Sequence, residues 1–541
     1  MRAGPEHRDG GGLARPGAVL WLEEALRAES PPEACPPLAG VATADVAIVG
    51  GGFTGLWTAL HLRLARPDLR VTLLEATACG FGASGRNGGW ASGWQDELEQ
   101  LLGCASPAGA RFLLDECAAA ISGIQSFCAA WGIDCHWRQR GALWVASSPE
   151  QRPGLSEAVG TCAASGRPDL LETVEAGEVE RRTGSSALGG GARLTDAAAI
   201  HPGLLVRGLR RVAIRLGVQI HEGSPVLSID QRRGVSLLTP AGRVDAGAAV
   251  VALGAWTATL LPELSRALVV VPSHVVATGP LGRRVEPLAL AQGELVCDAQ
   301  STVHYAQVTR AGRLVFGRGG LGPLGWRSRP SPGHFADPSA TASLARDLTR
   351  WFPQLGGVAI THAWGGPVDR SPSRLPIVGR SERGAGRVYY AAGYSGNGVV
   401  PSFLVGKILT SLVCEADDPY ATCALVGRPA RWFPPEPLRS LGGELVRRGA
   451  LAADDREADG RSASMLEALA RRTSTRTLPG ALGPIGGRIP RFGGRISRDG
   501  AFGARERPRW AASLLRPREH SKHPAETTRG ARGRPTRGRM Q

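Results

Sequence analysis

The chain is poor in lysine and in aromatic side chains. Only Lys407 and Lys522 among its 64 basic residues are lysines, and aromatic residues make up 5% of the 541 positions. With 74 glycines and 39 prolines, this arginine-rich composition is typical of a GC-rich genome, so a single arginine says little about function. The formal charge of +16 would by itself suggest an anionic partner such as nucleic acid.

The positive charge is concentrated at the end of the chain. Residues 471–541 contain 18 basic and 4 acidic residues, a net charge of +14, which leaves +2 for the first 470. Apolar periodicity fails here and Gly, Arg and Pro dominate, so we expect residues 473–541 to form a disordered basic tail. A nucleic-acid-binding arm is the alternative, because arginines bind phosphates.

Signals for metal binding, secretion and membrane insertion are also missing. The ten cysteines are scattered, without C-x-x-C pairs or clustered histidines, so we expect reduced thiols and no metal site. The N-terminus lacks the cationic and apolar stretches of a secretory signal, and no apolar run approaches a membrane span of about eighteen residues. We therefore expect a cytoplasmic protein without a membrane partner.

A β-α-β unit is the clearest structural signal. The apolar run 45–50 leads into Gly52 and Gly55, leucines follow at helical spacing, and a second strand ends at Glu75, twenty residues beyond Gly55. Glycines between a strand and a helix let a pyrophosphate approach the helix N-terminus, and an acid at this distance can bind a ribose hydroxyl. This pattern predicts a dinucleotide site for FAD or NAD rather than NADP.

Two further G-x-G-x-x-G matches carry less weight. The match at Gly80, Gly82 and Gly85 opens no obvious helix, and the match at Gly317, Gly319 and Gly322 is interpreted as a turn. Elsewhere the patterns predict a helix at 202–217, strands at 218–221, 225–230, 235–239, 248–254 and 388–392, and a helix at 402–413. Alternating runs within 268–320 predict an antiparallel sheet in a second domain.

Several ordered motifs together point to one family. From about Trp21 to Arg448 the chain contains ADVAIVGGGFTGLWTA, GFGASGRNGGW, AVVALGAWT, WGGPVDRSPSRLPIVG, GYSGNGV and FPPEPLRSLGG. In these motifs it resembles the D-amino-acid oxidase and glycine/sarcosine oxidase (DAO) superfamily of FAD-dependent oxidoreductases, in particular its gamma-glutamylputrescine-oxidase-like branch.

The resemblance implies an α/β (α+β) fold. It would combine a Rossmann-type FAD-binding domain, built from discontinuous segments, with a substrate domain whose antiparallel sheet covers the flavin. We expect an N-terminal extension (1–40), an FAD domain (41–105, 195–262 and 360–415), a substrate domain (106–194 and 263–359), a helical or irregular extension (416–472) and the tail (473–541).

The resemblance also implies the cofactor residues. They are Gly50, Gly52, Thr54 and Gly55 at the pyrophosphate, Glu75 at the adenosine ribose, Ser84, Arg86, Asn87 and Gly88 along the ribityl and flavin, Val226 at the adenine, Gly254 beneath the cofactor, and Gly393, Ser395, Gly396, Asn397 and Gly398 at the pyrimidine edge. A core valine at 226 and a plain strand-to-helix turn at 395–397 are the structural alternatives. Some relatives tether the flavin through His or Cys, but Trp90 and Ala91 follow the glycine loop here, so we expect non-covalent FAD.

The activity implied is oxidation of an amine or amino acid at its C–N bond. Hydride would pass from the carbon bearing the neutral amine to flavin N5, and water would hydrolyse the imine. Some relatives use a lysine near N5 to promote reaction with oxygen, and neither Lys407 nor Lys522 is well placed for this. Oxygen and another electron acceptor therefore both stay open, as does a basic nucleic-acid-binding protein with an accessory flavin domain.

Four residues are candidates for the substrate pocket: His274, Tyr305, Arg318 and Tyr394. Arg318 could pair with a substrate carboxylate, His274 could face the flavin, and the tyrosines could form aromatic walls. A solvated arginine, a structural histidine and core tyrosines are the alternatives. No residue is singled out as catalytic.

Overall fold

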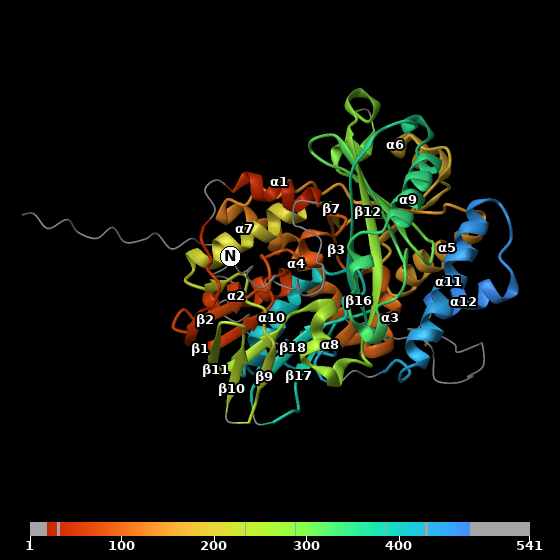
Figure 1. The fold of residues 1–541 in the computed structure, drawn as a ribbon. Coiled ribbons are helices and arrows are strands. Elements are labelled where there is room, and N and C mark those ends of the chain that lie inside the picture. The colour runs from red at the N-terminus through yellow and green to blue at the C-terminus, as the bar shows by residue number, and fades with distance from the viewer. Residues whose placement is uncertain are drawn as a thin grey trace, which may run out of the picture.

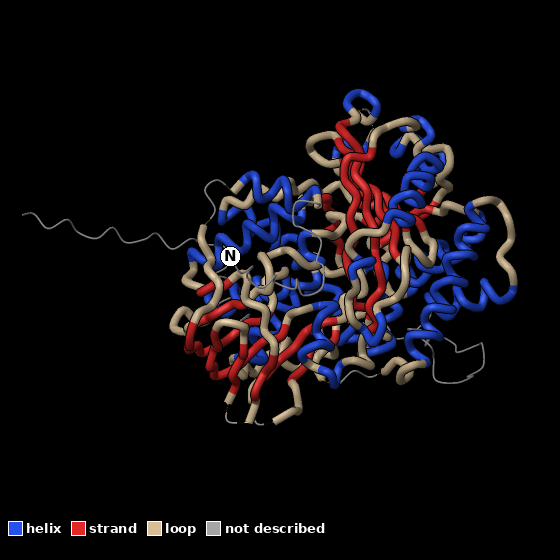
Figure 2. The backbone as a smooth tube through the Cα atoms, viewed as in Figure 1, coloured by secondary structure: helices blue, strands red, loops and turns tan. Residues whose placement is uncertain are grey.

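The computed structural model describes residues 19–475 except 30–32, 233, 287, 385 and 428–430. Residues 1–18 of the expected N-terminal extension and residues 476–541 of the expected tail lie outside the described residues. Residues 473–475, expected to begin the disordered tail, instead form the end of a helix, because the backbone bonds of α12 (Met465–Thr475) continue through them. Figures 1 and 2 show two large sheets with helices packed around them. The helices are α1 (Leu20–Ala28), α2 (Phe53–Ala65), α3 (Leu98–Cys104), α4 (Pro107–Trp131), α5 (Arg152–Ala164), α6 (Ala176–Thr183), α7 (Pro202–Arg215), α8 (Thr257–Leu260), α9 (Pro338–Trp351), α10 (Pro401–Val413), α11 (Leu438–Ala458) and α12 (Met465–Thr475).

The first sheet contains the β-α-β unit expected from the sequence. Its strands follow the order β17 (Ile377–Arg380), β18 (Val388–Ala392), β11 (Gly242–Val251), β1 (Gly40–Val49), β2 (Val71–Leu74) and β8 (Gln219–His221). In addition, β10 (Val235–Leu238) pairs with β11, and β9 (Ser228–Asp230) pairs with β10. From β18 to β8 all neighbours are parallel. The carboxyl ends of β1, β11 and β2 therefore meet at one edge, where ligands bind in open parallel sheets.

The second sheet is antiparallel apart from the β13–β4 pair. Its order is β16 (Ile360–Arg370), β12 (Val269–Pro280), β15 (Arg313–Gly319), β14 (His304–Val308), β13 (Leu295–Asp298), β4 (Ala142–Val145), β6 (Gly191–Leu194) and β5 (Leu171–Val174). A small sheet pairs β3 (Trp90–Ser92) with β7 (Ala197–Ala199). The mixed fold class is thereby confirmed.

Three local predictions differ from the structure. The strand expected at 225–230 begins only at Ser228. Gly317 and Gly319, interpreted as a turn, belong to strand β15. Backbone hydrogen bonding to β12 on one side and β14 on the other holds this strand extended, and such pairing does not depend on side chains. Residues 360–370, expected in the FAD domain, form the edge strand β16 of the second sheet.

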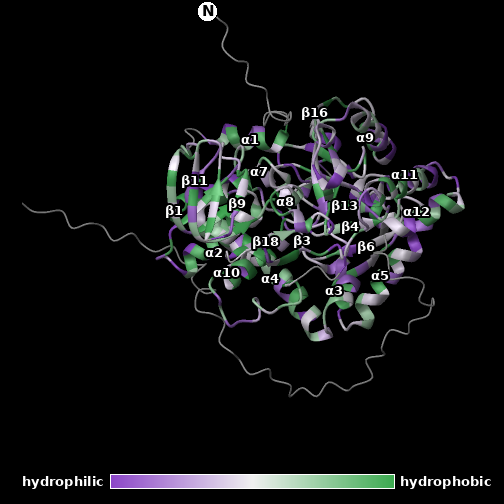
Figure 3. Ribbon diagram, turned by 60° about the horizontal axis from the view of Figure 1, so that its bottom comes forward, coloured by the Kyte–Doolittle hydropathy of each residue, from purple (hydrophilic) through white to green (hydrophobic). Residues whose placement is uncertain are grey.

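The main core lies between the first sheet and its helices. Helix α2 is buried along most of its length and packs against α10 and α7. Trp57 meets Phe403 edge to face, with ring centroids 4.8 Å apart. Figure 3 shows the apolar residues gathered in this part of the molecule. A helix that is apolar all round, as α2 is, is suited to such a position.

Helix α4 corrects the expectation that no apolar segment approaches the length of a membrane span. It has 25 residues and is, within the described part of the chain, the one helix that is long and apolar enough to cross a membrane. Its residues Leu113, Cys117, Ile121 and Ile124 are nevertheless buried in the main core, and it packs against α10. Core packing accounts for its composition.

A buried polar network joins the second sheet to helices α9 and α11. His304 bonds Asp298 at 2.9 Å and Asp347 at 3.0 Å, and Arg318 pairs with Asp347 at 3.1 Å and Asp455 at 2.8 Å. Burial alone would raise the pKa of Asp347, but hydrogen bonding to His304 and the charges of His304 and Arg318 lower it to about 2. Arg318 is 1% exposed, and among the residues named here Asp455 alone is largely exposed, at 53%.

Replacing Arg318 by Met should destabilise the protein strongly. The change leaves Asp347 buried beside one cation fewer, and breaking a buried ion pair costs about 3 to 5 kcal/mol. Urea unfolding would measure this loss. Arg310→Met is the matched control, because Arg310 forms an exposed pair with Asp134 at 2.8 Å and should cost less than about 1 kcal/mol. Equal effects of the two substitutions would contradict a stabilising network.

Candidate cofactor and substrate site

A single cavity of about 1240 Å³ lies between the two sheets. Its walls include the glycine loop after β1, the end of β2, the loop after β18 and one face of β12 and β16. Pockets for drug-sized ligands have volumes of roughly 300 to 1000 Å³. The cavity is therefore large enough for an extended cofactor together with a small substrate.

The glycine loop after β1 has no room for side chains. Gly50 has a φ of +110°, and a Cβ there would lie 2.4 Å from the Ala252 carbonyl oxygen. A Cβ on Gly55 would lie 2.0 Å from the Gly50 carbonyl oxygen, and one on Gly52 would lie 2.9 Å from Ser84 Oγ. These contacts let β1, β11 and α2 approach closely and leave a bare backbone facing the cavity. A pyrophosphate needs such a surface at a helix N-terminus.

The start of α2 is aligned by two hydrogen bonds. Ser84 Oγ accepts from the Phe53 backbone N–H at 2.8 Å, and the Thr54 and Tyr394 hydroxyls lie 2.7 Å apart. Gly52 precedes the helix and provides no capping side chain. The positive end of the α2 dipole consequently faces the cavity, as an anionic ligand requires.

Glu75 lies where the sequence predicts a ribose-binding acid. Its carboxylate accepts hydrogen bonds from Gly51 N–H at 2.7 Å and Thr77 N–H at 3.0 Å, and it lines the cavity. Burial raises the pKa of Glu75, and these two backbone bonds oppose the increase. Val226 lines the cavity as well.

Arg86 provides a buried cation without a carboxylate partner among the described residues. Its guanidinium lies 4.7 Å from the Phe81 ring centroid and 5.0 Å from that of Phe335, and it donates to the carbonyls of Phe81 and Gly365. Burial lowers the pKa of Arg86 to about 10. Its Nη2 atom is buried and bonds no described residue. A cavity-lining donor in this state fits an electron-rich acceptor on a cofactor.

Asn87 and Gly88 shape the same loop. The Asn87 side chain accepts from Gly89 N–H at 2.8 Å and donates to the Ser84 carbonyl at 3.0 Å. A Cβ on Gly88 would lie 2.5 Å from the Tyr305 ring, so only glycine lets this ring approach the loop. Both residues line the cavity.

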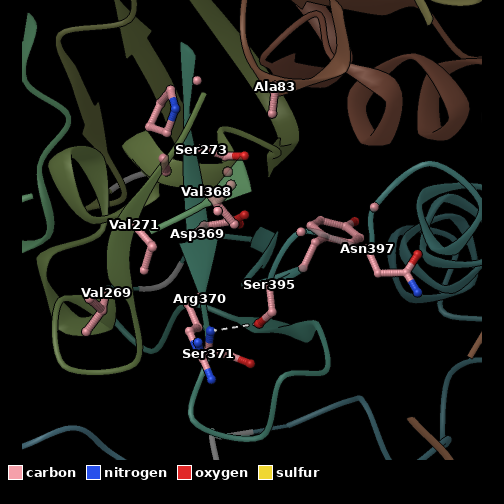
Figure 4. Close-up of a pocket in the computed structure, with 18 of the residues that line it drawn as sticks. Ala83, Val269, Val271, Ser273, Val368, Asp369, Arg370, Ser371, Ser395 and Asn397 are labelled. Carbon is pink, nitrogen blue, oxygen red and sulfur yellow. Dashed lines mark hydrogen bonds between the residues drawn. The ribbon is translucent and has the colours of Figure 1, made fainter. Parts of the chain in front are cut away.

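The loop at 393–398 is attached to β16. Asp369 accepts from Gly393 N–H through its side chain, and its own carbonyl accepts from Ser395 N–H at 2.9 Å. Ser395, held at a φ of +56°, accepts from Ser371 N–H at 3.1 Å, as Figure 4 shows. Asn397 donates to the Gly93 carbonyl at 2.9 Å. The loop is thus held by specific bonds. Residues 394–398 line the cavity together with Gly254, whereas Gly393 does not.

Strand alternation decides which residues of the second sheet face the cavity. Val269, Val271 and Ser273 on β12 stand opposite Arg370, Val368 and Gly366 on β16, and all six line the cavity. Figure 4 shows this face of the two strands. Successive side chains of a strand point to opposite faces. The intervening residues Val270 and His274 of β12 therefore do not line the cavity, whereas Pro272 on β12 and Asp369 on β16 still reach it.

Two of the four substrate candidates lie on the wrong face. His274 pairs with Arg318 across β12 and β15, and neither residue lines the cavity. His274 bonds the Gly333 carbonyl at 3.1 Å. Arg318 belongs to the buried network, so it is not the solvated arginine that the sequence offered as its alternative role. Their position away from this cavity disfavours the expected roles of both in substrate binding, which stay predictions.

The two tyrosine candidates do line the cavity. Tyr305 hydrogen-bonds Ser273 through their hydroxyls, 3.1 Å apart, and Tyr394 hydrogen-bonds Thr54. Burial raises the pKa of both phenols, that of Tyr305 to about 12. Both therefore remain protonated at neutral pH.

Asp369 and Arg370 are cavity residues that the sequence analysis did not select. Both lie in the quoted motif WGGPVDRSPSRLPIVG, which was a signal for their importance. Burial raises the pKa of Asp369 to about 6. Lys407 lies elsewhere, 3.4 Å from Glu116 in α4, and does not line the cavity.

The glycine cradle at a parallel sheet, joined by one cavity to an antiparallel sheet, defines a dinucleotide-dependent oxidoreductase. The chain belongs to the DAO family, described as FAD dependent oxidoreductase, whose model matches residues 45–412. Its cofactor is accordingly FAD.

Curated relatives match over most of their length. The chain is 33% identical over 383 residues to "Probable oxidoreductase OrdL" of Rhizobium meliloti (strain 1021), covering 70% of this chain and 84% of that protein. It is 32% identical over 375 residues to "Gamma-glutamylputrescine oxidoreductase" of Escherichia coli (strain K12), with 69% and 84% covered. The family resemblance recognised in the sequence is confirmed.

Solved structures share the fold. Glycine oxidase from Geobacillus kaustophilus superposes with a TM-score of 0.57 at 23% identity, covering 70% of this chain and 96% of that one. Iminodiacetate oxidase from Chelativorans sp. BNC1 gives a TM-score of 0.56 at 19% identity, with 71% and 100% covered.

Gly55→Ala should abolish FAD binding. The added methyl would lie 2.0 Å from a backbone oxygen, so the loop and α2 must move apart. The ratio of flavin absorbance to protein would fall by at least about tenfold, for a cost of about 1.4 kcal/mol or more. Gly160→Ala is the control, because a Cβ there meets nothing within 4 Å. Full flavin content in Gly55→Ala would contradict a role of the glycine loop in binding the pyrophosphate of FAD.

Asp369 should make stability depend on pH. Its pKa of about 6 in the folded chain exceeds the value of about 3.9 in an unfolded one. The native state keeps this proton between pH 4 and 6 while the unfolded state releases it, so stability falls as pH rises through that window. The free energy of unfolding should fall by roughly 3 kcal/mol across this window. Urea unfolding of the wild type and Asp369→Asn at pH 4 and pH 7 tests this, and parallel pH profiles would contradict it.

Proposed function

We propose that the protein oxidises an amine or amino acid at its C–N bond with bound FAD as the electron acceptor. The observation that carries this proposal is the continuity of the cavity from the glycine cradle to the inner face of β12 and β16. Cofactor and substrate would thereby share one cavity. The names of the relatives support an amine or amino-acid substrate, since they include gamma-glutamylputrescine and glycine.

The glycine loop and α2 would bind the pyrophosphate, and Glu75 the adenosine ribose. The loop at 393–398 would lie against the flavin, with Arg86 donating to an acceptor on the cofactor. When bound, the flavin supplies the acceptor for two electrons and a proton from the substrate carbon. The substrate nitrogen loses its proton to solvent, and water hydrolyses the imine to a carbonyl compound and an amine or ammonia.

The sheet face above this site favours an uncharged amine. Val269, Val271 and Val368 line it with apolar side chains. Burial disfavours the protonated form of an amine, so the substrate would lose its proton on binding. The phenols of Tyr305 and Tyr394, which stay protonated, would orient it without titrating.

Two kinds of electron acceptor could reoxidise the flavin, oxygen and another electron carrier. The location of Lys407, away from the cavity, favours the second. Cytoplasmic location and non-covalent FAD stay predictions. Trp90 and Ala91 provide no tethering nucleophile after the glycine loop, so acid precipitation should release the flavin.

An anaerobic screen tests this function directly. Purified protein should be yellow, and its flavin absorbance should bleach when a suitable polyamine, N-methyl amino acid or D-amino acid is added. In air, rapid hydrogen peroxide formation would identify oxygen as acceptor, whereas turnover only with an added dye would identify a dehydrogenase. Protein that takes up no FAD, or flavin that no amine reduces, would refute the proposal.

A further inference from the structure

The turn at the end of α4 brings two thiols into contact. Helix α4 ends at Trp131, and Gly132 follows in the left-handed region with a φ of +64°. The Ile133 backbone N–H then donates back to the Cys128 carbonyl at 2.8 Å. Such a turn reverses the chain at the end of a helix. It returns Cys135 to the side of Cys128, with the two Sγ atoms 3.9 Å apart.

The two sulfur atoms are close enough for a small movement to join them. Both thiols are free in the structure. A disulfide bond requires a distance of about 2 Å between the sulfur atoms. Side-chain rotation together with a small shift of residues 133–135 would provide it. Cys117, by contrast, lies eleven residues before Cys128 on the same helix, about 16 Å along its axis, and cannot reach it.

The pair lies just beneath the protein surface. Cys128 is 4% exposed and Cys135 is 1% exposed, whereas Gly132 and Asp134 in the connecting turn are exposed. The ends of helices open locally at a lower cost than the core does. Opening of this one turn would admit an oxidant as small as hydrogen peroxide and would still exclude larger reagents.

The two thiols differ in how firmly they hold their protons. The hydrogen bond with Cys135 and, to a smaller extent, burial raise the pKa of Cys128. Cys128 therefore keeps its proton. Because the thiolate and not the thiol is the nucleophile, Cys135 is the sulfur that would react first.

Backbone hydrogen bonds connect this pair to the cofactor side of the site. The Cys135 carbonyl accepts from His201 N–H at 2.8 Å, and Arg138 and Ala199 exchange two backbone hydrogen bonds of 3.0 Å. Ala199 in β7 pairs with Trp90 in β3, and Trp90 lines the cavity directly after the glycine loop. A bond that draws Cys135 toward α4 would therefore pull on the strand next to this loop.

We propose that Cys128 and Cys135 are a peroxide-sensitive pair of thiols whose oxidation to a disulfide weakens the binding of FAD. The inference rests on the proposed function only for the source of the peroxide, which the flavin would produce if oxygen is its acceptor. The site of oxidation itself belongs to the turn after α4 and lies outside the cavity.

The oxidation takes two steps. The Cys135 thiolate attacks one oxygen of hydrogen peroxide, the O–O bond breaks, and Cys135 becomes a sulfenic acid. The hydroxide released takes back the proton that Cys135 had lost and becomes water. The Cys128 sulfur then attacks the Cys135 sulfur, and hydroxide leaves and takes up the Cys128 proton as a second water. Two electrons thus pass from the two thiols to peroxide.

The first test detects the disulfide by mass spectrometry. Reduced, FAD-loaded protein is treated with hydrogen peroxide, alkylated in denaturant and digested with trypsin. Residues 112–138 form one tryptic peptide that contains Cys117, Cys128 and Cys135. After peroxide this peptide should carry one alkyl group, on Cys117, instead of three. Dithiothreitol should restore all three.

Matched variants assign the bond. Cys128→Ala and Cys135→Ala should each prevent it, whereas Cys117→Ala should not. The exposed thiol of Cys104 serves as an internal control, since it should gain oxygen without losing a partner's alkylation. Three alkyl groups after peroxide, a bond that includes Cys117, or addition of oxygen to Cys135 with Cys128 still alkylated overturns the inference.

The second test measures the Kd of FAD for the reduced and the oxidised protein. Coupling between two sites typically changes an affinity about 5-fold to 150-fold, so oxidation should raise this Kd at least about fivefold. Peroxide-treated Cys128→Ala should keep the Kd of the reduced wild type. Equal Kd values for the reduced protein and for protein that carries the disulfide overturn the link to the cofactor.

Both tests are independent of the amine substrate, because the peroxide is added. If amines bleach the flavin but no disulfide forms, this inference alone fails. If the disulfide forms and weakens FAD binding but no amine reduces the flavin, the oxidase function fails and the thiol pair stands.

Discussion

The alternation of side chains along β12, β15 and β16 is the constraint on which the site depends. One face of this sheet covers the cavity and the other packs against α9, so position in the register assigns most residues to one side, with Pro272 and Asp369 as exceptions that reach the cavity. The cavity face receives valines, Ser273 and Arg370. The opposite face receives His274, Arg318 and His304, which either bond backbone or join a closed network of acids. A shift of register by one residue would exchange these two sets and destroy both the cavity and the network.

The first sheet imposes a constraint of a different kind, the exclusion of side chains. Gly50, Gly52 and Gly55 allow β1, β11 and α2 to approach until backbone atoms touch, and this contact exposes the helix N-terminus to the cavity. A pyrophosphate at this loop would therefore meet backbone rather than side chains. Arg86, held between two phenylalanine rings, is an example of a side chain whose position is fixed by packing while its charge is left unpaired.

The sequence predicts the cofactor half of the site better than the substrate half for a physical reason. Strand, glycine turn, helix and acid are adjacent in the chain, so spacing alone positions Gly50, Gly55 and Glu75. The substrate half is assembled from strands separated by up to about a hundred residues, and their faces depend on pairing. Arg318 and Arg370 look alike in the sequence, but the register buries one in a network and turns the other toward the cavity.

Charge in this protein has to be judged residue by residue, because the composition is dominated by arginine. The net charge of +16 reflects mainly residues 471–541, and three of the arginines that line the cavity, Arg374, Arg439 and Arg447, are each paired with a nearby glutamate. Arg86 beside the glycine loop, Arg370 beneath α12 and Arg431 form no ion pair with another described residue. Arg86 is buried against two phenylalanine rings, and the charge of the cavity residue Glu97 acts on Arg370. Arg370 is covered by the end of α12, so access to it depends on a segment that the family match does not include.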